Sequence, residues 1–88
     1  MFDLVKVSKA FSDKNRLKIL TMLSSSTKNV GEVAQSLKVE ENLASHHLRV
    51  LAGLGFLKSS KKGREVFYVV NKDKVGSILT DMRKEIVK

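Results

Sequence analysis

Residues 39–57 read VEENLASHHLRVLAGLGFL, and this stretch decides the fold. Leu48 and Leu51 lie three residues apart, which predicts a helix from about residue 41 to residue 52 with one apolar side. The more polar positions of that helix are Ser45, His46 and Arg49. Gly53 and Gly55 follow, and glycine readily adopts the backbone angles that end a helix.

Two helices are predicted at the start of the chain, because apolar residues recur there at spacings of three and four. The first runs over residues 2–11, and its apolar stripe consists of Phe2, Leu4, Val7 and Phe11. The second runs over residues 16–23 after an N-cap at Ser12 or Asp13. Its stripe consists of Leu17, Leu20 and Leu23.

A third, short helix is predicted over residues 30–37, directly before the turn that leads into residue 41. Asn29 and Glu32, three residues apart, form a capping pair at its start. Its buried face is expected to consist of Val33, Ala34 and Leu37.

After residue 55 the pattern changes from helical to strand-like. Residues 56–59 and 65–70 are rich in β-branched and aromatic side chains, and the polar, basic residues 60–64 join them. This predicts a β-hairpin with a glycine-containing tip. A last helix follows a cap at Asn71 or Asp73, and its apolar stripe consists of Val75, Ile78, Leu79, Met82 and Ile86.

These elements predict a mainly α fold with a β-hairpin wing. Two helices around a tight turn (residues 30–52) followed by a two-stranded ribbon (residues 56–70) make a winged helix-turn-helix. The chain of 88 residues is expected to form one such domain over residues 1–88. A DNA major groove admits one helix, and the preceding helix would hold the reader over the backbone.

Composition points to a polyanionic partner. The 17 Lys and Arg residues outnumber the nine Asp and Glu residues, which gives a net charge of +8. A charge of this sign attracts nucleic acid, and the alternative is that the charged residues only form a solvated surface. No apolar run reaches the roughly 18 residues of a membrane span, and the N-terminal residues alternate charged with apolar side chains. We therefore expect no membrane association and a cytoplasmic location.

Three stretches together resemble the ArsR/SmtB family of bacterial and archaeal repressors. Residues 13–20 match an Asp-x-x-Arg-Leu-x-Ile-Leu pattern, residues 45–51 match Ser-x-His-Leu-x-x-Leu, and residues 63–70 are similar to the family's wing strand. The resemblance covers about residues 10–70. It implies a homodimeric DNA-binding transcriptional regulator, often a repressor that a metal ion releases.

The chain departs from that family at its metal sensors. It contains no cysteine, whereas the family's thiolate sensor uses cysteines near the short helix before the reader. The family's other sensor uses Asp, His and Glu on the last helix, where this chain offers Asp73, Asp81 and Glu85 but no histidine. Carboxylates alone do not select soft or borderline metals. We therefore expect neither a metal site nor a cofactor.

The predicted reader helix supplies the candidate base contacts. Ser45, His46 and Arg49 are expected to face the groove, with Asn42 and Leu43 at the leading end. The alternative for His46 is an ordinary solvent-exposed histidine. The family motif places the neighbouring His47 in the interior as a hydrogen-bonded packing residue. Glu40 and Glu41 either cap the helix or discriminate among sequences.

Basic residues of the wing are the candidate phosphate contacts, or reach the adjacent minor groove. They are Lys58, Lys61, Lys62 and Arg64. Lys28 and Asn29, at the start of the short helix, are expected to add a phosphate contact.

The two terminal segments, residues 1–11 and 73–88, are expected to form a dimer interface. The residues assigned to it are Leu4, Val7, Phe11, Val75, Ile78, Leu79, Met82 and Ile86. The alternative is that both segments cover the core of a monomer. A dimer would match an inverted repeat in double-stranded DNA.

The function expected is therefore sequence-specific, repressing regulation of transcription. An enzyme is disfavoured, because the sequence offers no phosphate-cradling glycine loop, metal cluster or nucleophile with a base at suitable spacing. The alternative is a winged helix that binds protein or RNA, since the fold alone does not determine the partner.

Overall fold

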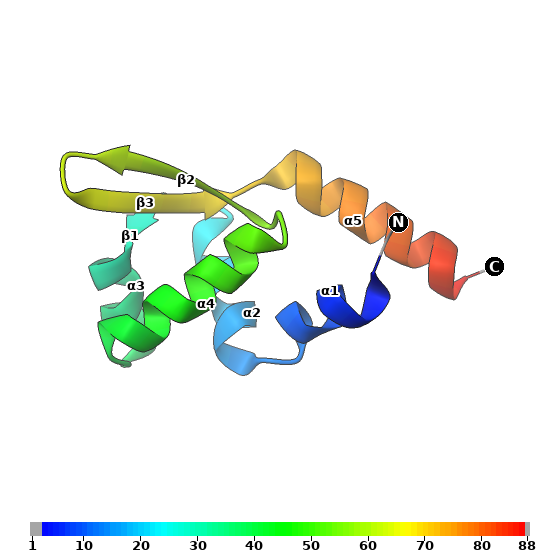
Figure 1. The fold of residues 1–88 in the computed structure, drawn as a ribbon, viewed down its shortest axis with the longest axis horizontal. Helices are drawn as coiled ribbons and strands as arrows, with labels where there is room; N and C mark the ends of the chain where they lie inside the picture. Colours follow the sequence, from blue (N-terminus) through cyan, green and yellow to red (C-terminus); the bar gives the residue numbers. More distant parts are fainter. Residues whose placement is uncertain (1–2, 88) are drawn as a thin grey trace.

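The computed structural model describes residues 3–87 and shows five helices and three strands within that range (Figure 1). In chain order the elements are α1 (Leu4–Phe11), α2 (Lys14–Leu23), β1 (Lys28–Asn29), α3 (Val30–Leu37), α4 (Glu41–Gly53), β2 (Leu57–Lys62), β3 (Glu65–Val70) and α5 (Lys72–Ile86). The mainly α fold with a β-hairpin wing is thus confirmed. Phe2, expected in the first helix, lies outside the described residues.

Side-chain caps fix where four of the five described helices begin, and Asp3 caps α1 by accepting from the Lys6 N–H. Asp13 accepts hydrogen bonds from the backbone N–H groups of Asn15 and Arg16, so α2 starts two residues earlier than the apolar pattern predicted. Asn29 and Glu32 form the expected capping box at the start of α3. Asn71, rather than Asp73, caps α5 by accepting from the Lys74 N–H.

The sheet differs from the expected two-stranded ribbon. It has three antiparallel strands in the order β1-β3-β2, and β1 pairs Lys28 with Tyr68 and Asn29 with Phe67. The β2–β3 pairing runs from Leu57 opposite Val70 to Lys62 opposite Glu65. The loop between the strands is therefore two residues long, and the expected five-residue basic link was wrong. Gly63, the first loop residue, has a φ of 63°, which suits a tight hairpin.

The core lies where α2, α3, α4 and the base of the wing meet. Its largest fully buried side chains are Phe56, Ile19, Leu23, Leu48, Leu51 and Val33. On α2 the buried pair is Ile19 and Leu23, four residues apart, and Leu17 is 44% exposed. The prediction that Leu17 belongs to the stripe that packs in the core was therefore wrong. The apolar side of α2 is broader than the part of it that the core covers.

The arrangement in space places α4 between the wing on one side and α1 with α2 on the other (Figure 1). The wing tip extends at one end of the molecule, and α1 and α5 lie toward the other end, where both described termini are found. The molecule measures 44 × 22 × 21 Å over its described residues. No helix within residues 3–87 is long and apolar enough to cross a membrane.

Candidate nucleic-acid interface

Helix α4 has one buried and one open face. Its buried residues are Ala44, His47, Leu48 and Leu51. Asn42, His46 and Arg49 recur at intervals of three and four on the opposite, exposed face, while Ser45 at its edge is half-buried. Leu43 is 43% exposed. The structure thus brings the candidate base-contacting residues together on one side of α4.

The start of α4 carries two exposed acids. Glu40 occupies the N-cap position, but its side chain makes no capping hydrogen bond. Of the two roles left open for this residue, capping by its side chain is therefore not seen. Glu40 and Glu41 still lie where the partial positive charge of a helix N-terminus favours an acid.

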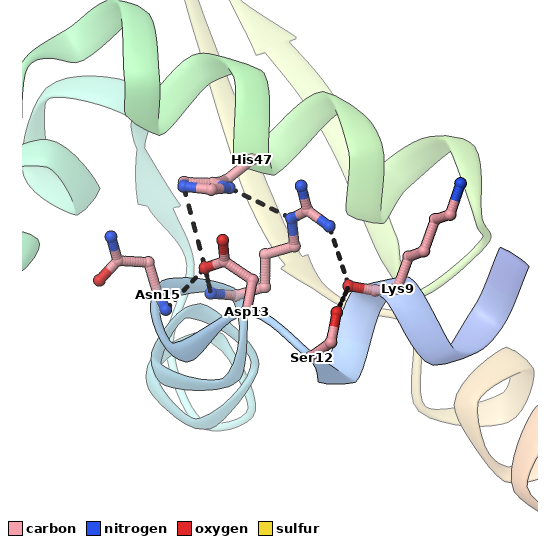
Figure 2. Close-up of polar contacts among 6 residues, drawn as sticks. Lys9, Ser12, Asp13, Asn15 and His47 are labelled. Carbon is pink, nitrogen blue, oxygen red and sulfur yellow. Dashed lines mark hydrogen bonds and ion pairs between the residues drawn. The ribbon is translucent and has the colours of Figure 1, made fainter. Parts of the chain in front are cut away.

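His47 connects the reader helix to the junction of α1 and α2 (Figure 2). The Arg16 Nε–H donates to His47 Nδ1 at 3.2 Å, and Arg16 Nη1 donates to the backbone oxygen of Lys9 at 2.9 Å. His47 Nε2 lies 4.0 Å from Asp13 Oδ1. His47 is 4% exposed, so its expected role as a buried, hydrogen-bonded residue is confirmed. The outward position of His46 is confirmed as well.

Sequence reasoning missed the partners in this network. Asp13 and Arg16 were noted only as part of the family pattern and not as partners of His47. Arg16 and His47 are 31 residues apart in the sequence. Through these contacts Arg16 ties α4 to the end of α1. The network therefore joins α1, α2 and α4 at one point.

Burial lowers the pKa of His47 below its ordinary value, and the charge of Arg16 acts in the same direction against the opposing charge of Asp13. Partial burial of Asp13 favours its neutral form. Hydrogen bonds from the backbone N–H groups of Arg16 and Asn15, with the charge of Arg16, nevertheless lower the pKa of that carboxyl. The neutral imidazole and the ionised carboxylate are thus the states that fit this site.

Acidification is expected to destabilise the protein through His47. Because its pKa is lower in the folded chain, the unfolded chain binds the proton first, and stability falls as the pH drops below about 6.5. Protonation would also place an N–H on Nδ1, facing the Arg16 donor. Urea unfolding at fixed protein concentration between pH 7.5 and 5.5 should show a steeper loss for the wild type than for His47→Gln. His46→Gln is the matched control, and coinciding slopes for wild type and His47→Gln would contradict this role.

The wing carries the expected basic residues on both of its faces. Lys58, Lys61, Lys62 and Arg64 are all exposed. Because strand side chains alternate, Lys58 and Lys62 share one face of β2 and Lys61 lies on the other. Lys62 Nζ lies 5.7 Å from the centre of the Phe67 ring, which steadies that cation.

Asn29 is engaged within the fold. Its Oδ1 accepts from the Glu32 N–H at 2.8 Å, and its Nδ2 donates to Glu65 Oε1 at 3.1 Å. These bonds hold the start of α3 against the wing. Of the two residues expected to contact phosphate here, Lys28 therefore remains the candidate.

Within residues 3–87, no three or more His, Asp or Glu side chains lie together as metal ligands. Of the acids on α5, Asp81 and Glu85 lie about one turn apart, and Asp73 lies more than two turns before them. That metal ions do not act on this protein stays a prediction.

The family model described as "Bacterial regulatory protein, arsR family" matches residues 13–59 of this chain. The chain belongs to this family. That range contains the Asp13–Arg16–His47 network, all of α4 and the start of the wing. The resemblance inferred from the three sequence patterns is thereby confirmed.

Several sequence relatives cover most of the chain, and two of them show what it is similar to. A cadmium resistance transcriptional regulatory protein CadC homolog from Staphylococcus aureus is 38% identical over 78 residues, which are 88% of this chain and 64% of that protein. The chain therefore spans less than two thirds of that relative's length. The transcriptional repressor SdpR from Bacillus subtilis is 32% identical over 65 residues, 74% of this chain and 72% of that one.

The fold is also that of a solved homodimeric winged helix-turn-helix DNA-binding domain, Mb0332 from Mycobacterium bovis. The two superpose with a TM-score of 0.75 at 22% identity, over 97% of this chain and 82% of that one. The chain thus combines the winged helix-turn-helix fold with membership of a family of bacterial transcriptional regulators, which are not enzymes.

Proposed function

We propose that this ArsR-family protein is a homodimeric repressor that binds an inverted repeat in double-stranded DNA. The observation that carries the proposal is the open face of α4, where Asn42, His46 and Arg49 lie exposed beside a basic wing. One relative that covers most of this chain is named a transcriptional repressor, which supports the direction of regulation.

In this proposal α4 enters the major groove. Arg49 is long enough to donate to guanine or to a phosphate, and Asn42, Ser45 and His46 offer shorter hydrogen bonds. Leu43, which is 43% exposed, is available to a thymine methyl group. Lys58, Lys61, Lys62 and Arg64 of the wing, with Lys28, contact phosphates or the adjacent minor groove.

The dimer interface is proposed at the end of the molecule formed by α1 and α5. Val7 and Ile78 are 7% and 6% exposed, so these two expected interface residues already pack in the core of the single chain. Leu79 is 50% exposed and Ile86 is 63% exposed, and both lie on the apolar side of α5. Leu79 also lines an apolar groove of about 440 Å³ with Phe11 and Val75. Together with the half-buried Leu4 and Met82, these residues offer the surface that a second copy would cover.

Reader and wing variants are expected to fail in different ways. Arg49→Ala should cost about 1–3 kcal/mol on the preferred site and reduce its advantage over random DNA, because base contacts carry specificity. Changing Lys61 and Lys62 together to Ala should weaken specific and random DNA alike. It should also lower the salt slope by about one unit for each phosphate that the wing no longer neutralises.

Both variants are measured by titrating labelled duplexes over a series of salt concentrations. Ser25→Ala, which alters an exposed residue of the loop after α2, serves as a control that should bind as the wild type does. If Arg49→Ala keeps full affinity and specificity while the wing variant keeps its salt slope, this face does not bind DNA. A protein or RNA partner would then be favoured.

Metal ions are expected to leave the complex intact. The chain has no cysteine, and both of its histidines are on α4, where His47 is already bound to Arg16. Titration of zinc, cadmium or arsenite into the protein–DNA complex should leave its occupancy unchanged. Stoichiometric release at low micromolar metal would contradict this prediction.

A further inference from the structure

A basic cleft of about 410 Å³ lies beside α4, on the side away from the wing. Lys6 and Lys9 of α1, Arg16 of α2 and Arg49 of α4 supply its four cations. The other residues that line it are Val50, Gly53 and Leu54. No acidic side chain is among the described residues that line this cleft.

The cleft is continuous with the open face of α4. Arg49 belongs to both. The next residue, Val50, lies about 100° further around the helix, on the side of α1 and α2. Figure 1 shows α4 lying between the wing and the α1–α2 pair. The reader helix is therefore flanked by cations on both sides, by the wing lysines on one and by this cleft on the other.

Two kinds of cation meet in the cleft. Lys6 and Lys9 are exposed, and in Figure 2 the Lys9 side chain extends from α1 toward α4. Arg16 is half-buried and held in place, because its Nε donates to His47 and its Nη1 to the Lys9 carbonyl. Among residues 3–87, Nη2 of Arg16 has no hydrogen-bond partner. A guanidinium held by hydrogen bonds, with exposed ammonium groups beside it, suits an anion with several acceptor oxygens.

We propose that this cleft binds a phosphate group of the DNA backbone, on the strand opposite the one that the wing contacts. A helix in the major groove lies between two phosphate backbones, so cations on each side of α4 can meet one of them. Lys6, Lys9 and Arg16 lie beside α4 in the cleft formed with α1 and α2. The inference rests on the proposed DNA binding and adds α1, which the sequence patterns assigned only to dimerisation.

The test changes Lys6 and Lys9 together to Ala in the full chain. Both side chains are exposed, and the Lys9 carbonyl that Arg16 contacts belongs to the backbone, so the fold should be retained. Affinity for specific and random duplexes should fall by the same factor, and the salt slope should fall by about 0.9 for each phosphate that the cleft no longer neutralises. Lys72→Ala with Lys84→Ala removes the same charge from exposed positions on α5 and is the matched control. Equal salt slopes for the cleft variant and this control would overturn the proposal.

A second measurement identifies the source of the phosphate. Single methylphosphonate substitutions, each of which neutralises one phosphate, are scanned along the bound duplex. At one position per half-site the wild type should lose affinity while the Lys6 and Lys9 variant loses none further. The absence of any such position would overturn the proposal. So would saturation of the cleft by inorganic phosphate at micromolar concentration without DNA, because the site would then serve a free anion.

The outcome is separable from that of the proposed function. If Arg49→Ala reduces specificity and the wing variant lowers the salt slope, DNA binding by α4 stands. A cleft variant that behaves as its control would then remove only the assignment of α1 to the DNA backbone.

Discussion

Leu79→Glu is expected to separate the two protomers and to lower affinity for a duplex with two half-sites by about 10²–10⁴-fold. Linking two binding modules makes the second contact intramolecular, and a monomer loses that advantage. Leu79 is 50% exposed, so a charge there can be accommodated in the single chain, whereas an apolar interface between copies would have to bury it. Sedimentation gives the mass, and titration of duplexes with one and two half-sites gives the affinity.

Thr80→Glu is the matched control, because it adds the same charge at an exposed neighbouring position on another side of α5. It should remain dimeric. A Leu79→Glu protein that stays dimeric at micromolar concentration would remove α5 from the interface. Val7 and Ile78 are poor sites for this test, because both are buried in the monomer and a charge there would unfold it.

Phe56→Ala is expected to destabilise the protein by about 3–5 kcal/mol. Phe56 is fully buried, and its ring meets that of Phe11 edge-on at 5.3 Å. Its backbone N–H donates to Leu51 O and its carbonyl accepts from the Asn71 N–H. The residue thus joins the end of α4 to the start of α5, and the cavity left by alanine would loosen both.

Urea unfolding at fixed protein concentration measures this loss. Leu43→Ala serves as the control, because Leu43 is 43% exposed on the open face of α4 and its truncation should change stability little. Equal losses for the two variants would show that Phe56 does not anchor this junction.

Local signals predicted much of the fold. The bounds of α3 were expected at 30–37 because Asn29 and Glu32 cap one another within four residues. The end of α4 followed from Gly53 and Gly55, and Gly55 adopts a φ of 90°. Features of this kind depend on residues that are close in sequence, so they can be recognised from a single sequence.

The missed features depend on pairs of residues that are distant in sequence. β1 has two residues and no periodicity, and only its pairing with Phe67 and Tyr68 makes it a strand. The polar character of Lys61 and Lys62 predicts a loop, yet pairing with β3 places them in the exposed part of β2. In the same way, the Arg16–His47 hydrogen bond and the basic cleft arise only when α1 and α2 pack beside α4.

Site residues on α4 were predictable because a helix places residues three and four apart on one side. The sequence did not predict which residues of the terminal helices stay exposed for a partner. The apolar stripe of α5 contains both Ile78, which is 6% exposed, and Leu79, which is 50% exposed. The chain's own core covers the first of these residues and not the second.

Selection of bound sequences from a random pool of duplexes, with the purified protein, tests most directly whether two copies read DNA through α4. An inverted repeat should be enriched, with half-site centres separated by about one helical turn (10–10.5 bp) or a multiple of it. Arg49→Ala should lose preference at specific positions within each half-site. Recovery of sequences without any shared motif, or of an unrepeated half-site alone, would contradict the dimeric, sequence-specific reading of DNA.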